Sequence, residues 1–493
     1  MSDTNHHTAR DPEDSRQSRP QGDAATRLGT EGIGRLLVRF SLPAISGMLV
    51  QALYNIVDRI FVGRGVNELA LGGISLVMPL MTVSMAFAML FGVGSANMIS
   101  MRLGQGRRDE AQNALNHCFF IALFIGVVLA IVQLVFLDFF LSLLGSGMGP
   151  ELVGYARNYY RVILYGMVFN QVGFGFSHCT RAQGFPAITM TGMFIGAGTN
   201  LILDPIFIFV CKWGVEGAAW ATIISQAISS LFILHFAAGK KAVVRLQPRS
   251  FRPSPAMAVQ IMAFGSAQFL LQFIMSAVMF INNKSMGWYG AAGLGIPNGA
   301  DVAMSGLNIA GSLMMVIMMP VFGINQGAQP ILGFNYGAKK FRRVIKAYCG
   351  AVGAATIICT AGFIVIQALP HVLVGIFAPN GSRALLEFAP KALRIQTLLL
   401  PLTGFQVMSA NMFIVTGRPK ISIFLTMLRQ FLALIPCMLI FGRVWGLYGV
   451  VAAAPVADSF AVLLTGGMIL FEMRKLRAVI RQQETAGAEP AAQ

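Results

Sequence analysis

The stretch "FFIALFIGVVLAIVQLVFL", from Phe119 to Leu137, contains no charged residue and only one amide. An α-helix needs roughly 20 mainly apolar residues to cross the hydrocarbon core of a bilayer, and this stretch meets that length. A strand of a membrane barrel would instead alternate apolar and polar residues over a shorter segment. A helix also pairs its own backbone N–H and C=O groups, which lipid cannot do. The stretch therefore predicts a transmembrane helix.

The rest of the chain shares this character. Of the 493 residues, 55% are hydrophobic and only 12% are charged, and the mean hydropathy of +0.67 lies outside the usual range of soluble domains. Further apolar runs bring the number of predicted spans to twelve, which begin near Leu36, Leu69, Asn116, Tyr155, Pro186, Val215, Met257, Ala300, Ile345, Ala392, Ile421 and Leu447. We therefore expect an all-α membrane protein with twelve transmembrane helices.

The formal charge of +17 is concentrated in every second loop. These basic loops hold Arg102, Arg107, Arg108, Arg181, Lys240, Lys241, Arg245, Arg249, Arg252, Lys339, Lys340, Arg342, Arg343, Lys346, Arg418 and Lys420. An excess of Lys and Arg marks cytoplasmic loops, so the charge indicates membrane orientation and argues against a nucleic-acid partner. With an even number of spans, we expect both termini in the cytoplasm and the protein in the cell inner membrane.

Both ends of the chain are polar. Residues 1–32 lack the apolar h-region of a signal peptide, and we expect them to form a disordered cytoplasmic tail. Residues 477–493 are expected to form a second cytoplasmic tail. The six cysteines are scattered singly without Cys-x-x-Cys spacing, which favours small core residues over metal ligands or disulfides.

An internal repeat divides the chain into two halves. "FGVGSANMISMRLGQGRRDEA" from Phe91 is similar to "FGINQGAQPILGFNYGAKKFR" from Phe322, at an offset of 231 residues. "RAQGFP" matches "IVTGRP", and "WGVEGAAWA" matches "WGLYGVVAA", at nearly the same offset. Such repeats predict two pseudo-symmetric six-helix lobes around a central cavity. We place the N-terminal lobe at residues 33–239, a basic linker at 240–256 and the C-terminal lobe at 257–476.

Polar residues inside the predicted spans of the first lobe form stripes of helical spacing. The first span carries Gln51, Tyr54, Asn55 and Asp58, the fifth carries Asn200 and Asp204, and the sixth carries Thr222 and Gln226. Residues three or four apart share one face of a helix, so these stripes can converge on one polar site. Pro205 has no N–H, which leaves the carbonyl oxygen of Leu201 available as a further ligand.

Each acid in a span also has a structural interpretation. An aspartate at the centre of a membrane helix costs about 2.5 to 3.5 kcal/mol on insertion scales, so a functional role is the default. Asp58 lies beside Arg59 and could form a surface ion pair, whereas Asp204 has no such neighbour. Asp138 and Asp458 lie near predicted helix ends, where packing or interfacial roles fit better.

The second half lacks the paired acids of the first. The repeat places Ile435 opposite Asp204 and Asn282 opposite Asp58. Methionine-rich surfaces suit a promiscuous hydrophobic site, although the same residues also fit ordinary lipid-facing positions. The candidate residues of a substrate cavity are Met275, Met279, Asn282, Met314, Met318 and Arg429. Arg429 fits either a cavity-lining charge or a side chain that snorkels to the interface.

Several of these motifs occur together in one family. With "RAQGFP", "NLILDPIFIF", "GVEGAAWATIISQ" and "GINQGAQPILGFNYGAKKFRRV", the chain resembles the multidrug and toxic compound extrusion (MATE) transporters, specifically their MepA-like bacterial branch, over about residues 33–476. The resemblance implies two lobes and cation-coupled export of amphipathic, often cationic drugs.

The resemblance also assigns residues. It implies a cation site at Asp58, Asn200, Asp204 and Thr222, which could hold a sodium ion or exchange a proton. Supporting polar residues are Gln51, Tyr54, Asn55, Ser177 and Gln226. Many relatives carry Asn shortly before the "RA-x-G" element, where this chain has Ser177 and His178.

Three functions compete on the sequence. The leading one is antiport of lipophilic cationic drugs against protons or sodium ions, by a monomer in contact with membrane lipid and without a cofactor. A flippase for lipids or lipid-linked precursors is the alternative, but it would favour a strongly basic cavity, for which Arg161, Arg394 and Arg429 are the candidates. An intramembrane aspartyl enzyme is less favoured, because neither Asp58 nor Asp204 has a Gly-x-Gly-Asp context. No Walker motif is present, so ATP is not expected to supply the energy.

Overall fold

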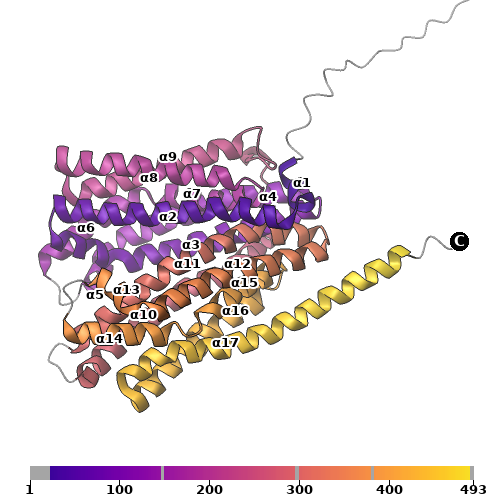
Figure 1. Ribbon diagram of the computed structural model, residues 1–493. Helices are drawn as coiled ribbons and strands as arrows, with labels where there is room; N and C mark the ends of the chain where they lie inside the picture. The colour runs from indigo at the N-terminus through magenta and orange to yellow at the C-terminus, as the bar shows by residue number, and fades with distance from the viewer. Residues whose placement is uncertain (1–22, 146–148, 295–298, 379–381, 489–493) are drawn as a thin grey trace, which may run out of the picture.

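The computed structural model describes residues 23–145, 149–294, 299–378 and 382–488 (Figure 1). Helices are the only regular elements in this part of the chain. The first half contains α1 (Asp23–Thr30), α2 (Ile33–Gly65), α3 (Glu68–Gly104), α4 (Arg108–Val135), α5 (Leu137–Leu144), α6 (Pro150–Tyr165), α7 (Met167–Ala182), α8 (Pro186–Pro205), the π-helix η1 (Ile206–Val210) and α9 (Gly214–Ala238).

The second half begins after a short 3₁₀ turn, η2 (Pro248–Ser250). It contains α10 (Pro255–Leu294), α11 (Gly299–Gly337), α12 (Phe341–Ala368), α13 (Pro370–Phe377), α14 (Arg383–Gln396), α15 (Leu400–Val415), α16 (Pro419–Met427), the π-helix η3 (Leu428–Leu434) and α17 (Ile435–Ala488). Figure 1 shows α8 and α9 on one side of the bundle and α16 and α17 on the other, with α3 and α11 between them.

The described helices confirm an all-α membrane fold. Nine of them are long and apolar enough to cross a membrane, and the pair α14 and α15, bent by 47°, makes a tenth. Two features of the backbone bear on the remaining two predicted spans. Gly446 interrupts α17 with non-helical angles, φ 60° and ψ −138°, between the last two predicted spans. Helices α6 and α7 adjoin at Gly166, in the region of the fourth predicted span. The helices are therefore consistent with the predicted twelve.

The internal repeat corresponds to a repeated turn geometry. Gly184, between α7 and α8, has φ of 101°, and its counterpart Gly417, between α15 and α16, has φ of 79°. In both turns a proline two residues later begins the next helix. Positive φ is open to glycine at no steric cost and proline suits the first turn of a helix, so the same turn forms twice.

The two lobes meet closely along α3 and α11. A Cβ atom placed on Gly104 of α3 would lie 2.0 Å from the carbonyl oxygen of Phe334 on α11. Reciprocally, a Cβ on Gly337 of α11 would lie 2.1 Å from the carbonyl oxygen of Met101 on α3. Gly104 and Gly337 are 233 residues apart, as are Met101 and Phe334, which is also the separation of Gly184 and Gly417, so the two contacts are reciprocal and fit a pseudo-twofold arrangement of the lobes. Glycine is needed at both positions because any side chain would force the helices apart.

The basic linker is fixed to the first lobe. The backbone N–H of Gln247 donates to Oδ1 of Asn116 at 3.1 Å, and that of Ser254 donates to Nε2 of His117 at 3.1 Å. Phe251 packs against the His117 ring, with 4.8 Å between the ring centroids. The linker is thus held against α4, although it connects the two lobes.

Parts of both predicted terminal tails are helical. At the C-terminus α17 continues through the basic run to Ala488, and the ion pair between Arg342 and Glu484 ties its last turns to the start of α12. Figure 1 shows this helix leaving the bundle. Lys, Arg, Gln, Glu and Ala are strong helix formers, which explains why this polar segment is helical. Residues 489–493 lie outside the described residues.

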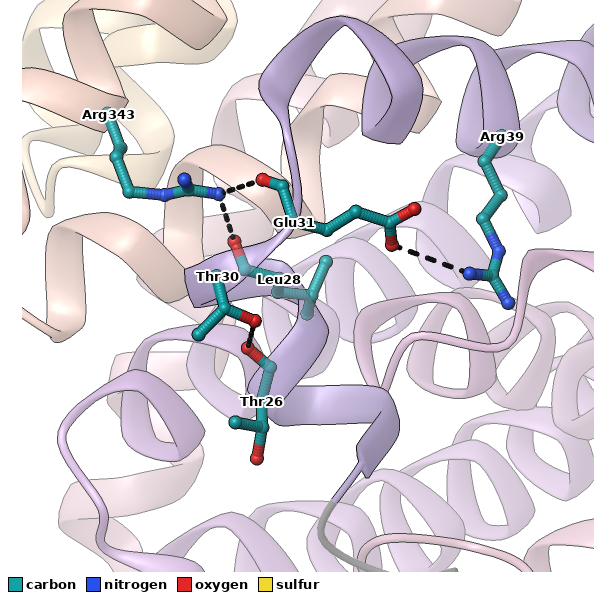
Figure 2. Close-up of polar contacts among 6 residues, drawn as sticks. All are labelled: Thr26, Leu28, Thr30, Glu31, Arg39 and Arg343. Carbon is teal, nitrogen blue, oxygen red and sulfur yellow. Dashed lines mark hydrogen bonds and ion pairs between the residues drawn. The ribbon is translucent and has the colours of Figure 1, made fainter.

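At the N-terminus, the last residues of the predicted disordered tail form α1, while residues 1–22 lie outside the described part of the chain. Leu28 is fully buried. Arg343 of α12 donates to the carbonyl oxygens of Leu28, at 3.3 Å, and Glu31, at 2.5 Å (Figure 2). The end of α1 leaves carbonyl oxygens without helical partners, and a cation of the other lobe pairs with them. Sequence composition alone could not show this contact.

We expect Arg343→Gln to release α1. Charge-assisted hydrogen bonds contribute about 1.5 to 3 kcal/mol each, so losing two should speed trypsin cleavage after Arg27 about tenfold or more. The measurement is the rate at which the fragment that begins at Leu28 appears. Arg39→Gln is the matched control, because the ion pair that Arg39 forms with Glu31, at 3.5 Å, is exposed (Figure 2). Equal cleavage rates for Arg343→Gln and Arg39→Gln would contradict the docking role of Arg343.

Candidate functional site

Two polar residues of the predicted site lie on α8, one turn apart. Asn200 and Asp204 are 2% and 1% exposed. Nδ2 of Asn200 donates to Oδ1 of Asp204 at 3.2 Å. Pro205 ends α8 and the backbone widens into η1 directly after it, so the carboxylate lies where regular helical hydrogen bonding is interrupted.

The first span brings a second acid to the same place. Helix α2 packs against α8, and the carboxyl groups of Asp58 and Asp204 lie within hydrogen-bonding reach of each other. Tyr54, one turn earlier on α2, lies close enough to interact electrostatically with both acids, and its hydroxyl contacts the side chain of Gln51. The structure therefore brings together Tyr54, Asp58, Asn200 and Asp204 from two helices.

Two carboxyl groups within hydrogen-bonding reach of each other cannot both be ionised without a positive charge between them. Ionised carboxylates only accept hydrogen bonds, so their contact requires a shared proton or a bound cation. Oδ2 of Asp204 is buried and has no hydrogen-bond donor among the described residues. The amide oxygen of Asn200 and the hydroxyl of Tyr54 are further oxygen ligands of the kind that hard cations prefer. The site can therefore hold one small cation or one proton.

The other predicted members of the site are Thr222, Gln226, Ser177 and Asn55. Thr222 is buried on α9, the helix that packs along α8, and Gln226 is half-buried one turn further on. Ser177 donates to the carbonyl oxygen of Gly173 in its own helix, at 2.8 Å. The side chain of Asn55 lies outside the described residues.

Five of the six candidate substrate-cavity residues lie on α10 and α11, which pack against α3 and α2 of the first lobe. Met314 is half-buried and Met318 is 8% exposed, and both pack in the main hydrophobic core. Met275 is 48% exposed and Asn282 is half-buried. The side chain of Met279 lies outside the described part of the chain.

The structure gives Arg429 a partner that the sequence did not indicate. Its Nε lies 2.6 Å from Oδ1 of Asp458 on α17, in an ion pair whose side chains are 25% and 9% exposed. Arg429 also lies in η3, a π-helix in the second lobe. The two charges neutralise each other, so Arg429 is not a free cation.

A second polar group lies where α11 meets the first lobe, and sequence analysis did not single it out. Nη1 of Arg181 donates to Oε1 of Gln326 at 2.6 Å. Nε2 of Gln329 donates to Oδ1 of Asn97 at 2.8 Å. The sequence showed these polar residues within apolar runs. Which residue pairs with which depends on how the two lobes pack, and the sequence does not show that.

A two-lobed helical membrane protein with a pair of acids between helices of its first lobe has the architecture of a secondary transporter. The MatE family model matches residues 43–206 and 269–439, one stretch in each half. The chain therefore belongs to the MATE family of transporters.

Relatives and solved structures agree with this family. The chain is 27% identical to the multidrug export protein MepA of Staphylococcus aureus (strain MRSA252) over 431 residues, which cover 87% of this chain and 92% of that protein. It is also 27% identical to MepA of Staphylococcus haemolyticus (strain JCSC1435), over 88% of this chain and 92% of that protein.

Among solved structures, the chain is similar to one described as the outward-facing conformation of a multidrug resistance MATE family transporter of the MOP superfamily. The TM-score is 0.84 at 27% identity, covering 92% of this chain and 98% of that one. A MOP superfamily transporter from Pyrococcus furiosus, described as having a binding pocket of reverse polarity, gives a TM-score of 0.83 at 28% identity over 92% of this chain and 98% of that one. The protein is thus a multi-pass membrane transporter, and its relatives are transporters, not enzymes.

Proposed function

We propose that this protein exports amphipathic, mainly cationic drugs across the cell inner membrane in exchange for protons or sodium ions. The contact between the half-buried Asp58 and the buried Asp204 carries the proposal, because two acids that share one ion change their charge balance whenever that ion leaves. Loss of the ion leaves like charges close together, which favours a rearrangement of α2 and α8. Ion exchange is thereby coupled to helix movement.

The proposed drug specificity rests on the two relatives described above, which are both multidrug export proteins. A methionine-containing surface on α10 and α11 suits ligands of different shapes. A lipid flippase receives less support, because Arg429, a candidate for binding phosphate, is already paired with Asp458.

We place both termini and the basic loops in the cytoplasm, following the charge asymmetry. Figure 1 shows α1 and the end of α17 at the same end of the bundle, as an even number of spans requires. A monomer suffices for this mechanism, because both lobes belong to one chain.

Expression in a drug-sensitive bacterium should lower the accumulation of ethidium several-fold, and an uncoupler should restore it. In proteoliposomes, dye efflux should follow an imposed proton gradient or an imposed sodium gradient, and the gradient that drives it identifies the coupling ion. Efflux that needed ATP, or unchanged accumulation of a panel of lipophilic cations despite correct membrane insertion, would contradict the proposal.

A further inference from the structure

A basic surface forms where the first turns of α12 meet the part of α17 that leaves the bundle (Figure 1). We call it the α12–α17 basic surface, and it comprises Arg342 and Lys346 of α12 with Arg474, Arg477 and Arg481 of α17. All five residues are exposed. The ion pair between Arg342 and Glu484 joins the two helices at this surface.

On α17 the basic residues directly follow an exposed apolar segment. Leu463, Leu470 and Phe471 are exposed, as side chains that face lipid are, and Phe471 is the last large apolar residue exposed on the described part of the helix. Arg474 and Arg477 come three and six residues later, which places them about 5 and 9 Å further along the helix axis. The headgroup layer of one leaflet is about 5 to 8 Å thick. These arginine side chains therefore lie at the depth of the lipid headgroups.

Helix α12 shows the same change from apolar to basic on one face. Ile357 and Ile364 are exposed in the membrane-spanning part of the helix. Lys346 precedes them by 11 and 18 residues, which are about three and five turns, so the three side chains share one face. Arg342 lies one turn before Lys346 on that face. The side of α12 that faces lipid therefore becomes basic at its first turns.

The two basic ends converge with little internal compensation. Arg477 and Arg481 lie on the same stripe of α17 as Glu484, seven and three residues before it, and Glu484 contacts Arg342. Among the described residues, neither Arg477 nor Arg481 forms an ion pair. The preceding acid of α17, Glu472, is buried and pairs with Arg418. One exposed carboxylate therefore faces several cations.

We propose that the α12–α17 basic surface binds the phosphate headgroup of an anionic phospholipid in the adjacent leaflet. Guanidinium groups donate paired hydrogen bonds to phosphate, and those of Arg477 and Arg481 can do so without first breaking an ion pair. The bound lipid holds the projecting end of α17 beside α12, because the exposed ion pair between Arg342 and Glu484 contributes little by itself. The inference goes beyond drug export and does not depend on it.

Fluorescence quenching by brominated lipid tests the surface at close range. Cys349 is exposed and lies three residues after Lys346, on the same side of α12. In a variant that retains Cys349 and has the other cysteines replaced by alanine, a fluorophore on Cys349 is exposed to lipids that occupy the surface. In phosphatidylcholine liposomes, brominated phosphatidylglycerol should quench it several-fold more strongly than brominated phosphatidylcholine at the same low mole fraction.

The matched control retains Cys211 in place of Cys349. Cys211 is exposed directly after η1, at the other end of the span that begins beside the basic turn at Gly184. A fluorophore there should be quenched equally by the two brominated lipids. Equal quenching at Cys349 as well, or the same preference for phosphatidylglycerol at both cysteines, would overturn the inference. Neither measurement involves transport, so these results leave the proposal of drug export untouched.

Charge removal separates a site from the general positive charge of this end of the bundle. Arg477→Gln with Arg481→Gln should reduce the preference at Cys349 several-fold, because each basic residue near an anionic surface strengthens binding about fivefold. The control Arg108→Gln with Arg249→Gln removes two exposed charges from the basic loops of the first lobe, and it should leave the preference unchanged. An unchanged preference in the first double variant, or an equal loss in both, would contradict a site at the α12–α17 basic surface.

Discussion

Asp204→Asn is expected to leave the protein folded and inserted in the membrane while gradient-driven drug efflux falls to background. Asparagine keeps the size of the side chain and can still accept the hydrogen bond from Asn200 at Oδ1. It cannot release or bind a proton, and it holds a cation less strongly because it has no negative charge. The measurement is ethidium efflux by purified protein in liposomes under imposed proton and sodium gradients, with melting in detergent as the control for folding.

Variants of the neighbouring residues should rank by how much each residue contributes to holding the ion. Asp58→Asn should be nearly as severe, because the two acids share one ion. Asn200→Ala and Thr222→Ala should reduce efflux less, since water can replace a neutral ligand in part. Ethidium binding without a gradient should change less than efflux in all four. Near-normal efflux by folded Asp204→Asn protein would return Asp204 to a structural role.

The fold was predictable because lipid imposes a strong constraint on the sequence. Long apolar runs must be helices, and basic residues in every second loop fix their alternation across the membrane. Gly184 and Gly417 could be matched from the sequence because the turn that each forms requires glycine. By contrast, α1 was missed because the side chain that caps it, Arg343, comes from a distant part of the chain.

Local spacing predicted the candidate site only within each helix, whereas its assembly from several helices was an expectation that the resemblance to the MATE family supported. Four-residue spacing placed Asn200 beside Asp204, and the hydrogen bond between them agrees with that spacing. The meeting of Asp58 with Asp204 depended on how α2 packs against α8, which no local pattern determines. The same holds for Arg181 with Gln326, which belong to different lobes and have no shared motif.

The ion pair between Arg429 and Asp458 shows how such a tertiary contact changes the interpretation of a residue. The sequence left Arg429 as either a cavity charge or a snorkelling side chain, and it treated Asp458 as a packing group. In the structure the two side chains form an ion pair between η3 and α17, with 2.6 Å between Nε of Arg429 and Oδ1 of Asp458. Removal of one partner from a buried pair leaves an uncompensated charge, which is far more costly than the absence of both.

Asp458→Asn should therefore lower the free energy of unfolding by at most about 3 to 5 kcal/mol, the range for breaking a buried ion pair. The loss should be smaller if the exposed part of the Arg429 side chain lets its charge reach water. We expect a fall of several degrees in the melting temperature in detergent. The double variant Arg429→Met with Asp458→Leu should recover most of that loss, because it removes both charges and fills similar volume. If the double variant melted as low as Asp458→Asn, the single variant's loss would reflect packing and not the unpaired arginine. If it melted normally but no longer exported ethidium, the pair would serve transport as well as stability.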